Sequence, residues 1–522
     1  MPIPPEIAHL TRQGTFTGFH GSPSTDVPFW IAPQNATQLR KALELCITHK
    51  TPASVKGSSW SISSITKPNR VLIDLGQFHN EVPPVRGVDS DHVDEAPAKG
   101  KYVHVRGNVL VRYLNHTLAM STPRLALSTS GAANGQAIAG AIATGSHGAA
   151  IGYGAIHEAV RAVCLLTSPD TAVLVQPEAA SFNEGLAKSL ASELGVPVVA
   201  LADDEAFGAA LVGLGAVGVV YSLVLEVEPL YQLKAVWVDR DADDQGVFDA
   251  IDDDEPARLA PSVANAFNVA FAFNPYPEQG TAIWGSVLRK IKPTEAYVGP
   301  RVAHPRFGNS INFWIAQQSP LLRKLCPGVV DWAIRQHYHD SAPPPDKALF
   351  PGDAFGDTTL AQGMGRGIEF AVHRRHAGKA LRCLLQALKR ELKDEGRALA
   401  GAMGMRYVGP SRLGLLGMNC ADRAKHPSFN GIACFEVGAM AGPRDANTTR
   451  IFQACERAMR ELDVPFTLHW GLENDGLLAS DIERYFGGNV DRWRKGRNRI
   501  LPDAVQQACF RNPLTAQVGL TS

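Results

Sequence analysis

The sequence predicts an α+β protein built in two parts. Up to about residue 230, strand-like and helix-like stretches alternate at short intervals, whereas from Tyr231 onward strand-like stretches are joined by longer connections. The chain has 522 residues, of which 45% are apolar and 20% are charged. This length and composition suit a protein of two or three domains with an ordinary buried core.

The first part opens with a capped helix that two short strands follow. Asn35 stands before the helix expected at 36–49, and Gln38 lies three residues further on, which is the spacing of a capping box. PASVKG then predicts a short strand that leads into the turn GSSWS, and VLIDLGQF predicts the next strand. The stretch YVHVRGNVLVRYL predicts a strand, a turn at Gly107 and Asn108, and a helix.

The stretch GLGAVG at 213–218 matches G-x-G-x-x-G, the fingerprint of a dinucleotide-binding turn, and Asp239 follows at a suitable distance. That fingerprint requires a strand before the glycines and a helix after them. Here the helix-like stretch DDEAFGAALV comes first and the strand-like stretch VVYSLVLEVEP comes second. Because the order is reversed, we do not expect a nicotinamide site of the Rossmann type.

The second part combines strand-like stretches with amphipathic helices. Strands are expected in LKAVWV, FNVAFAF, IEFAVHR, AMGMRYVG and IACFEVGAM, and a long helix in HAGKALRCLLQALKREL. Two further helices are expected around 310–340. The motif QHYHD groups His337, His339 and Asp340, but the further His or Cys of a metal site is missing, so we expect no metal.

Charge and composition narrow the range of partners. Lys plus Arg and Asp plus Glu each number 51, so no net charge favours nucleic acid or an anionic membrane. No apolar stretch reaches the length of a bilayer span, and the N-terminus has no signal-peptide pattern. The eight cysteines are scattered without C-x-x-C, which is typical of free thiols in a reducing cytoplasm.

Two turns rich in Gly and Ser carry the chemistry expected of the first part. They are GSSWS at 57–61 and TGSHG at 144–148. Glycine lets a backbone approach a ligand closely, and consecutive free amides form an anion-binding nest to which hydroxyl groups add donors. A diphosphate can therefore bind here without Lys or Arg, although each turn alone is also compatible with an ordinary tight turn.

The two turns, in this order and between these flanks, resemble the vanillyl-alcohol oxidase family of flavoproteins with its PCMH-type FAD-binding domain. Within that family the aldonolactone and alditol oxidase branch is the most similar. The similarity lies in WIAPQNATQLRKAL, SVKGSSWS, VLIDLGQF, GQAIAGAIATGSHG and GLGAVGVVYSLVLEVEP, and more faintly in PFTLHWG and RNRILPDAVQQACFRNP. It implies a two-subdomain FAD-binding domain at 1–230, an α+β substrate domain with an antiparallel sheet at 231–474, and a segment at 475–522 that returns to the FAD domain.

The resemblance implies that FAD is the cofactor and that backbone groups of Val219 and Val220 face its adenine. Trp60 occupies the position where many relatives carry a His bonded to the flavin, so we expect non-covalent FAD. Gly131 implies an open approach for O2 and therefore an oxidase that forms hydrogen peroxide. The cofactor-binding residues carried over from the family are Lys56, Gly57, Ser58, Ser59, Trp60, Ser61, Ser130, Gly131, Gln136, Ile138, Gly140, Ala141, Thr144, Gly145, Ser146, His147, Gly148, Gly218, Val219 and Val220.

Two departures from the family concern the substrate. The Glu-x-Arg pair of sugar-alcohol oxidases corresponds to GMR at 404–406, which keeps Arg406 and lacks the Glu. The Lys that follows HWG in the family is Leu472 here. Because both losses remove groups that would bind a polyol, we expect a substrate less polar than a sugar alcohol.

Oxidation of an alcohol requires a group that takes the hydroxyl proton and a positive group that stabilises the developing alkoxide. Arg406 is the candidate for the positive group, and a surface ion pair is its alternative role. For the proton, Glu436 and His469 rank ahead of Glu369. Glu436 lies among apolar residues in IACFEV and His469 can titrate near neutrality, although a solvent-facing Glu and a packed His fit equally well.

The preferred function is an FAD-dependent oxidase that takes a hydride from an alcohol or lactol carbon of a small molecule and reduces O2 to hydrogen peroxide. Two alternatives stay open. They are a dehydrogenase of the same fold with another electron acceptor, and a flavin-binding module without redox activity. A hydrolase is not expected, since GSSWS ends in Ser61 where the G-x-S-x-G elbow requires Gly.

Overall fold

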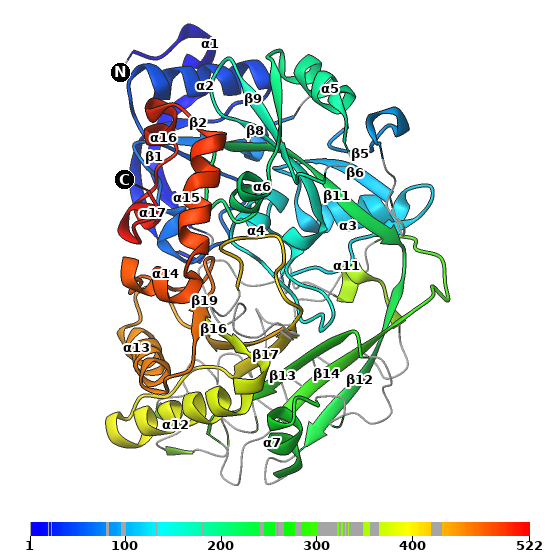
Figure 1. Ribbon diagram of the computed structural model, residues 1–522. Helices are drawn as coiled ribbons and strands as arrows, with labels where there is room; N and C mark the ends of the chain where they lie inside the picture. Colours follow the sequence, from blue (N-terminus) through cyan, green and yellow to red (C-terminus); the bar gives the residue numbers. More distant parts are fainter. Residues whose placement is uncertain are drawn as a thin grey trace.

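The computed structural model describes residues 2–521 except 19, 22, 80–82, 95–100, 132, 180–181, 241–244, 256–257, 259–265, 277–282, 300–320, most of 323–347, 355–364 and 419–430. Three sheets and the helices around them make up the described part (Figure 1). The α+β class expected from the sequence is confirmed. The QHYHD motif with His337, His339 and Asp340, and most of 310–340, lie outside the described residues.

The first sheet has the strand order β1-β2-β4-β3. β1 and β2 pair antiparallel, whereas β2, β4 and β3 run parallel, because α2 carries the chain back along the sheet between β2 and β3. Asn35 caps α2 by accepting a hydrogen bond from the amide of Gln38, as expected. The elements are α1 (Pro5–Ala8), β1 (Thr11–Thr17), β2 (Ser24–Ile31), α2 (Ala36–Thr48), β3 (Ala53–Lys56) and β4 (Val71–Asp74).

The second sheet has the order β10-β9-β8-β11-β6-β5, with β7 paired to β11. α6 precedes the turn at 213–218 and β11 follows it, so the order helix–turn–strand inferred from the sequence is confirmed. The strands are β5 (Val85–Gly87), β6 (Lys101–Arg106), β7 (Leu125–Ala126), β8 (Val160–Leu166), β9 (Ala172–Gln176), β10 (Val198–Ala202) and β11 (Val219–Pro229). The helices are α3 (Val111–Met120), α4 (Ile138–Ala143), α5 (Glu184–Leu194) and α6 (Asp204–Leu211).

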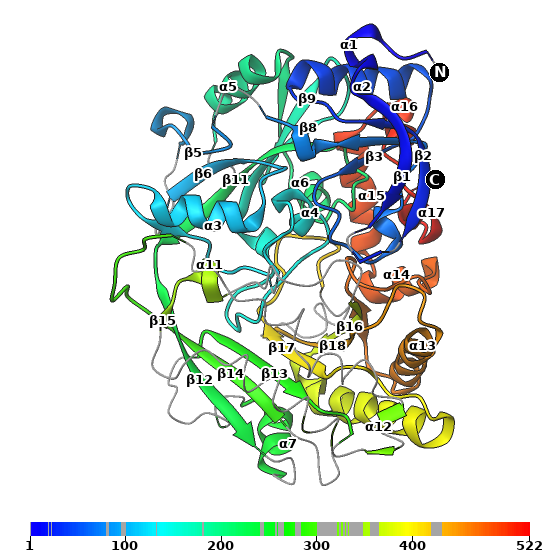
Figure 2. The ribbon, with the colours of Figure 1, turned by 180° about the vertical axis from the view of Figure 1, so that it is seen from behind.

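The third sheet follows residue 231 and has the order β15-β12-β14-β13-β17-β18-β16-β19. Every pairing described in it is antiparallel. Figure 2 shows α12 and α13 on the side of this sheet that faces away from the rest of the molecule. The strands are β12 (Gln232–Arg240), β13 (Asn268–Phe273), β14 (Ile283–Ile291), β15 (Ala348–Leu349), β16 (Arg366–His373), β17 (Met403–Val408), β18 (Ile432–Ala439) and β19 (Phe466–Leu468). The helices are α7 (Gln245–Asp252), α11 (Pro351–Ala354), α12 (Ala377–Glu395) and α13 (Ala446–Glu461).

The end of the chain packs against the first two sheets. Its helices are α14 (Ala479–Phe486), α15 (Asn489–Ile500), α16 (Ala504–Cys509) and α17 (Pro513–Gln517), drawn in red and orange in Figure 1, where α15 lies beside α6. Trp493 Nε1 donates to the carbonyl oxygen of Val212 at 3.1 Å, and Asn512 Nδ2 donates to that of Leu214 at 2.7 Å. Both bonds tie this segment to the turn between α6 and β11.

Membrane-spanning helices and the state of the cysteines can be stated for the described residues. None of their helices combines the length and the apolar character needed to cross a membrane. The seven cysteines among them are all free thiols.

Candidate functional site

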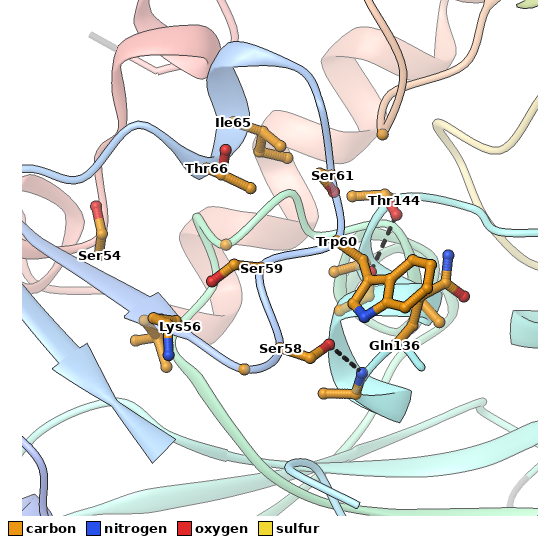
Figure 3. Close-up of a pocket in the computed structure, with 18 of the residues that line it drawn as sticks. Ser54, Lys56, Ser58, Ser59, Trp60, Ser61, Ile65, Thr66, Gln136 and Thr144 are labelled. Atoms are coloured by element: carbon orange, nitrogen blue, oxygen red, sulfur yellow. Dashed lines mark hydrogen bonds between the residues drawn. The ribbon is translucent and has the colours of Figure 1, made fainter. Parts of the chain in front are cut away.

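The two Gly/Ser turns lie side by side and line one cleft (Figure 3). The first turn follows β3 and the second follows α4. Ser58 Oγ accepts a hydrogen bond from the amide of Ala137 at 2.8 Å, at the start of α4. A Cβ at Gly57 would lie only 2.7 Å from the Cβ of Ala137, so the close approach of the first turn to the start of α4 requires glycine there. The cleft has an empty volume of about 1040 Å³, which includes space that is open to solvent.

The cleft presents polar groups that lack protein partners. Ser59 has the positive φ of +59°, a conformation that is costly for a non-glycine residue and typical of functional turns. Its Oγ and Gln136 Oε1 are buried and make no hydrogen bond to any residue that the structure describes. Because buried polar atoms are nearly always satisfied, this pattern fits a cleft whose natural ligand supplies the missing partners. The donors and the space suit the expected FAD.

Eleven of the twenty residues expected to hold the cofactor line this cleft. They are Lys56, Gly57, Ser58, Ser59, Trp60, Ser61, Gln136, Gly140, Ala141, Thr144 and Ser146. Nine are not part of its lining: Ser130, Gly131, Ile138, Gly145, His147, Gly148, Gly218, Val219 and Val220. Several residues outside the predicted set also line the cleft, among them Ser54, Thr66, Gly215 and Asn512.

Lys56 does not offer a free charge to the cleft. Its ammonium group pairs with Asp74 Oδ1 at 2.9 Å. A diphosphate bound here would therefore rely on amides and hydroxyl groups, as the composition of the two turns indicates.

Trp60 lies in the first turn and is closely packed. A Cβ at Gly135 would lie 2.2 Å from the Trp60 ring, so the indole packs directly on this glycine. His20 packs against the indole in an edge arrangement, with ring centroids 6.3 Å apart. An indole in this packed position offers no nucleophile for a covalent bond to a cofactor.

A cluster of charged side chains lies on one face of the third sheet. Gly404, Glu436 and Glu369 are direct neighbours across β17, β18 and β16. Arg406 and Cys434 form the next row on the same face, since side chains two residues apart in a strand point the same way. This register brings three of the four expected catalytic residues together.

Salt bridges connect this cluster to the second Gly/Ser turn. Glu369 accepts from Arg406 at 3.0 Å with Oε1 and from His147 Nε2 at 3.2 Å with Oε2. Arg406 also forms an ion pair with Glu436. His147 Nδ1 lies 2.9 Å from the carbonyl oxygen of Gly148, so both ring nitrogens of His147 can donate. The result is a row of alternating charges from His147 through Glu369 and Arg406 to Glu436.

The pKa shifts agree with this charge pattern. Burial alone would raise the pKa of Glu369, but His147 and Arg406 outweigh it and hold that pKa well below its usual range. Burial alone would lower the pKa of His147, but Cys434 and Glu369 raise it well above its usual value. Burial raises the pKa of Cys434, which keeps it a neutral thiol, so Glu369 is the counter-charge of His147.

His469 joins the cluster to the cleft. It lines the cleft, and its ring centroid lies 5.6 Å from that of His147. Burial lowers the pKa of His469 to about 4, so its ring is neutral at pH 7. The backbone beside it is fixed to the first turn, because Ile62 N donates to Gly471 O at 2.8 Å and Ser63 Oγ donates to Trp470 O at 2.6 Å.

The carboxylates of the cluster differ in access. The side chain of Glu369 is 3% exposed and both of its oxygens are engaged, whereas that of Glu436 is 28% exposed. Glu436 Oε1 makes no hydrogen bond to the described residues, and a Cβ at Gly367 would lie 3.4 Å from it. Glu436 is therefore the carboxylate that a ligand can reach.

Comparisons with known proteins agree with the fold and the cofactor. Residues 28–175 match the FAD_binding_4 family, described as an FAD binding domain. A protein of Neurospora crassa named "Putative D-arabinono-1,4-lactone oxidase" is 24% identical over 251 residues, which cover 48% of this chain and 37% of that protein. The chain thus spans little more than a third of this curated relative.

Solved structures give the fold over the whole chain. A solvent-stable cholesterol oxidase matches with a TM-score of 0.71 at 13% identity, covering 99% of both chains. A cholesterol oxidase of Brevibacterium sterolicum matches with a TM-score of 0.69 at 14% identity, again covering 99% of both. The expected fold of an FAD-binding domain with an α+β substrate domain is confirmed, and FAD is supported as the cofactor. The Neurospora crassa protein and both of these structures carry the name of an oxidase.

Proposed function

We propose that this chain is an FAD-dependent oxidase that removes a hydride from the CH–OH carbon of a small molecule and passes the electrons to O2, forming hydrogen peroxide. One observation supports this most directly. The cleft lined by the two Gly/Ser turns meets the row of charges on the third sheet at His469. A cofactor site and an acid–base cluster thus share one boundary residue.

FAD would be held by the amides of 57–61 and by the polar side chains of Ser58, Ser59, Gln136 and Thr144. Bound there, it supplies the acceptor for the hydride. The remaining residues carried over from the family, including the backbone of Val219 and Val220 for the adenine, stay part of this proposal. We also propose non-covalent attachment, because Trp60 cannot form the bond that His forms in relatives.

The charged cluster assigns separate roles to its members. Glu436 takes the hydroxyl proton of the substrate, because it is the accessible carboxylate. Arg406, held between two carboxylates, stabilises the negative charge that develops on the substrate oxygen. Loss of the C–H hydride then leaves a carbonyl group. Glu369 positions Arg406 and His147 and does not itself take the proton, since both of its oxygens already accept hydrogen bonds.

The surroundings of Glu436 favour a substrate that is less polar than a sugar alcohol. Gly367, Gly404 and Gly438 lie next to it, and Leu472 contacts the position of a Cβ at Gly367 at 3.9 Å. None of these four offers a side-chain hydrogen bond. A polyol would bury several hydroxyl groups here without partners, which is costly.

The proposal also assigns roles to the two parts of the chain and a location to the protein. We propose that 1–230 and 475–522 form the FAD part and that 231–474 form the substrate part. The free thiols and the neutral net charge support a cytoplasmic protein that binds neither nucleic acid nor membranes. The dehydrogenase alternative differs only in the electron acceptor.

The test uses the purified protein in three steps. Its visible spectrum before and after acid precipitation should show flavin absorbance that moves entirely to the supernatant. Anaerobic addition of apolar and polar alcohols should bleach the flavin with the apolar ones. Oxygen consumption with peroxide release should then follow in air, whereas bleaching without oxygen consumption would establish the dehydrogenase. A colourless protein that does not take up added FAD would overturn the proposal.

A further inference from the structure

His469 is fixed in one tautomer by the backbone that follows it. The amide of Gly471 donates to His469 Nδ1 at 2.9 Å, so Nδ1 must accept. In the neutral ring the proton therefore resides on Nε2. Asn474 Nδ2 donates to the carbonyl oxygens of His469 and Trp470 at 3.3 and 3.1 Å, which holds the peptide that carries the ring.

His469 Nε2 makes no hydrogen bond to the residues that the structure describes, and His469 lines the cleft. His469 lies where the cleft meets Glu369, Arg406 and His147, the end at which the reacting ring of FAD must lie for catalysis. The amide-rich turn at 57–61 leads up to this boundary, where Ile62 N donates to Gly471 O, and its amides serve the diphosphate. A flavin ring bound at this boundary would meet the fixed donor of His469.

We propose that His469 donates a hydrogen bond from Nε2 to an acceptor atom of the isoalloxazine ring, and that it does not act as the base. The inference rests on the proposed FAD site. Leu472, which replaces the family's Lys, provides no donor, so His469 is the neutral donor that this chain offers from the 469–472 segment. Such a donor stabilises the ring when electrons arrive on it.

The test compares His469→Gln with His469→Leu. The side-chain amide of Gln can donate near the position of Nε2, whereas Leu cannot donate. We expect the FAD dissociation constant of H469Q to stay within about twofold of the wild type, and that of H469L to rise about five- to tenfold, as for the loss of one hydrogen bond. The affinity of the bound flavin for sulfite, which increases when the ring tolerates negative charge, should fall in the same order. His116→Leu, on α3 and outside the cleft lining, is the matched control and should change neither value.

Three results would overturn the inference. They are unchanged FAD and sulfite affinity in H469L, equal losses in H469Q and H469L, or a change confined to the KM of the alcohol, which would place the donor on the substrate. Nitrogen-15 NMR of the histidine side chains in the wild-type protein tests the tautomer without any substitution, and a proton on Nδ1 of His469 would also overturn it. The FAD and sulfite affinities can be measured even if the protein binds FAD but oxidises no alcohol. Failure of the proposed activity is therefore distinguished from failure of this inference.

Discussion

Gly404 and Glu436 lie directly opposite each other on β17 and β18, and a Cβ at Gly404 would lie 3.8 Å from the Cβ of Glu436. The carboxylate that the Glu-x-Arg pair places two residues before the Arg is thus present on the neighbouring strand. Side chains that face each other across an antiparallel pair lie about 4.5–5.5 Å apart at their Cβ atoms and reach the same region of the sheet face. Glu436 therefore reaches Arg406 from the neighbouring strand, and a Glu at position 404 would reach it along β17.

Because the two positions are neighbours, a carboxylate introduced at position 404 should partly replace that of Glu436. Glu436→Gln should lower kcat about 100- to 10,000-fold, the usual contribution of a positioned base, and leave FAD binding unchanged. Gly404→Glu in the E436Q background should recover about tenfold, because the space at Gly404 accepts a Cβ at ordinary contact distance. Steady-state kinetics with the best alcohol from the screen measure both effects.

Glu184→Gln provides the control for the exchange. Glu184 lies on α5 with a side chain that is 84% exposed, far from the cluster in sequence and in the fold. Its activity should equal that of the wild type. If G404E in the E436Q background stays as inactive as E436Q alone while both proteins bind FAD, the equivalence of the two positions is wrong.

His469 makes stability depend on pH in the acid range. Its pKa is lowered by burial from 6.5 in the unfolded chain to about 4 in the folded protein. Between these values the unfolded state binds a proton that the folded state does not, so stability falls as the pH falls from 6.5 to 4. The loss should amount to about 3 kcal/mol. Thermal unfolding across this range should show a smaller loss in H469Q than in the wild type, and identical pH profiles would contradict the prediction.

The two turns could be predicted from the sequence because their chemistry is local. Gly57 and Ser58 are adjacent, and the need for free amides and a close approach can be seen in the residue types alone. The helix capped by Asn35 was predicted for the same reason. Chain-local patterns of this kind do not depend on how distant segments pair.

The charged cluster could not be derived fully from the sequence, because it depends on strand register. Nothing in IACFEV reveals that Glu436 pairs with Gly404 and Glu369, or that Cys434 lies beside His147. The sequence also does not show that both carboxylate oxygens of Glu369 are engaged, because their partners Arg406 and His147 come from separate segments of the chain. Asn512 reaches the cleft through the packing of the C-terminal helices, for which RNPLTAQ gives no signal beyond a helix cap.

Gly140 tests whether the cleft holds FAD. It lies in α4 and lines the cleft, and a Cβ there would meet no protein atom within 4 Å. Gly140→Ala should leave the apoprotein as stable as the wild type or about 0.5–1 kcal/mol more stable, since Ala favours helix over Gly. The added methyl group would occupy cofactor space, so the FAD dissociation constant should rise about tenfold.

Gly152→Ala is the control for Gly140, because a Cβ at Gly152 also meets nothing within 4 Å but this exposed residue does not line the cleft. Its FAD affinity, measured by quenching of flavin fluorescence, should match that of the wild type. Equal FAD affinity in both Ala variants would show that the cofactor does not approach α4.

The substitution Gly131→Ala tests whether this position controls the reaction of the reduced flavin with O2 without affecting oxidation of the substrate. A Cβ there would lie 3.5 Å from Ala133 O and 3.6 Å from Gln136 Oε1, which are ordinary contacts, so Gly131→Ala should fold without strain. Gln136 lines the cleft, so the new methyl group would narrow the approach to the flavin at that side. We expect the anaerobic reduction of the flavin by the alcohol to stay within about twofold of the wild type and its reoxidation by O2 to slow about tenfold, equivalent to about 1.4 kcal/mol in the barrier. Stopped-flow absorbance measures the two half-reactions separately. Reoxidation at the wild-type rate would show that O2 reaches the flavin from another side and that Gly131 does not control the choice of acceptor.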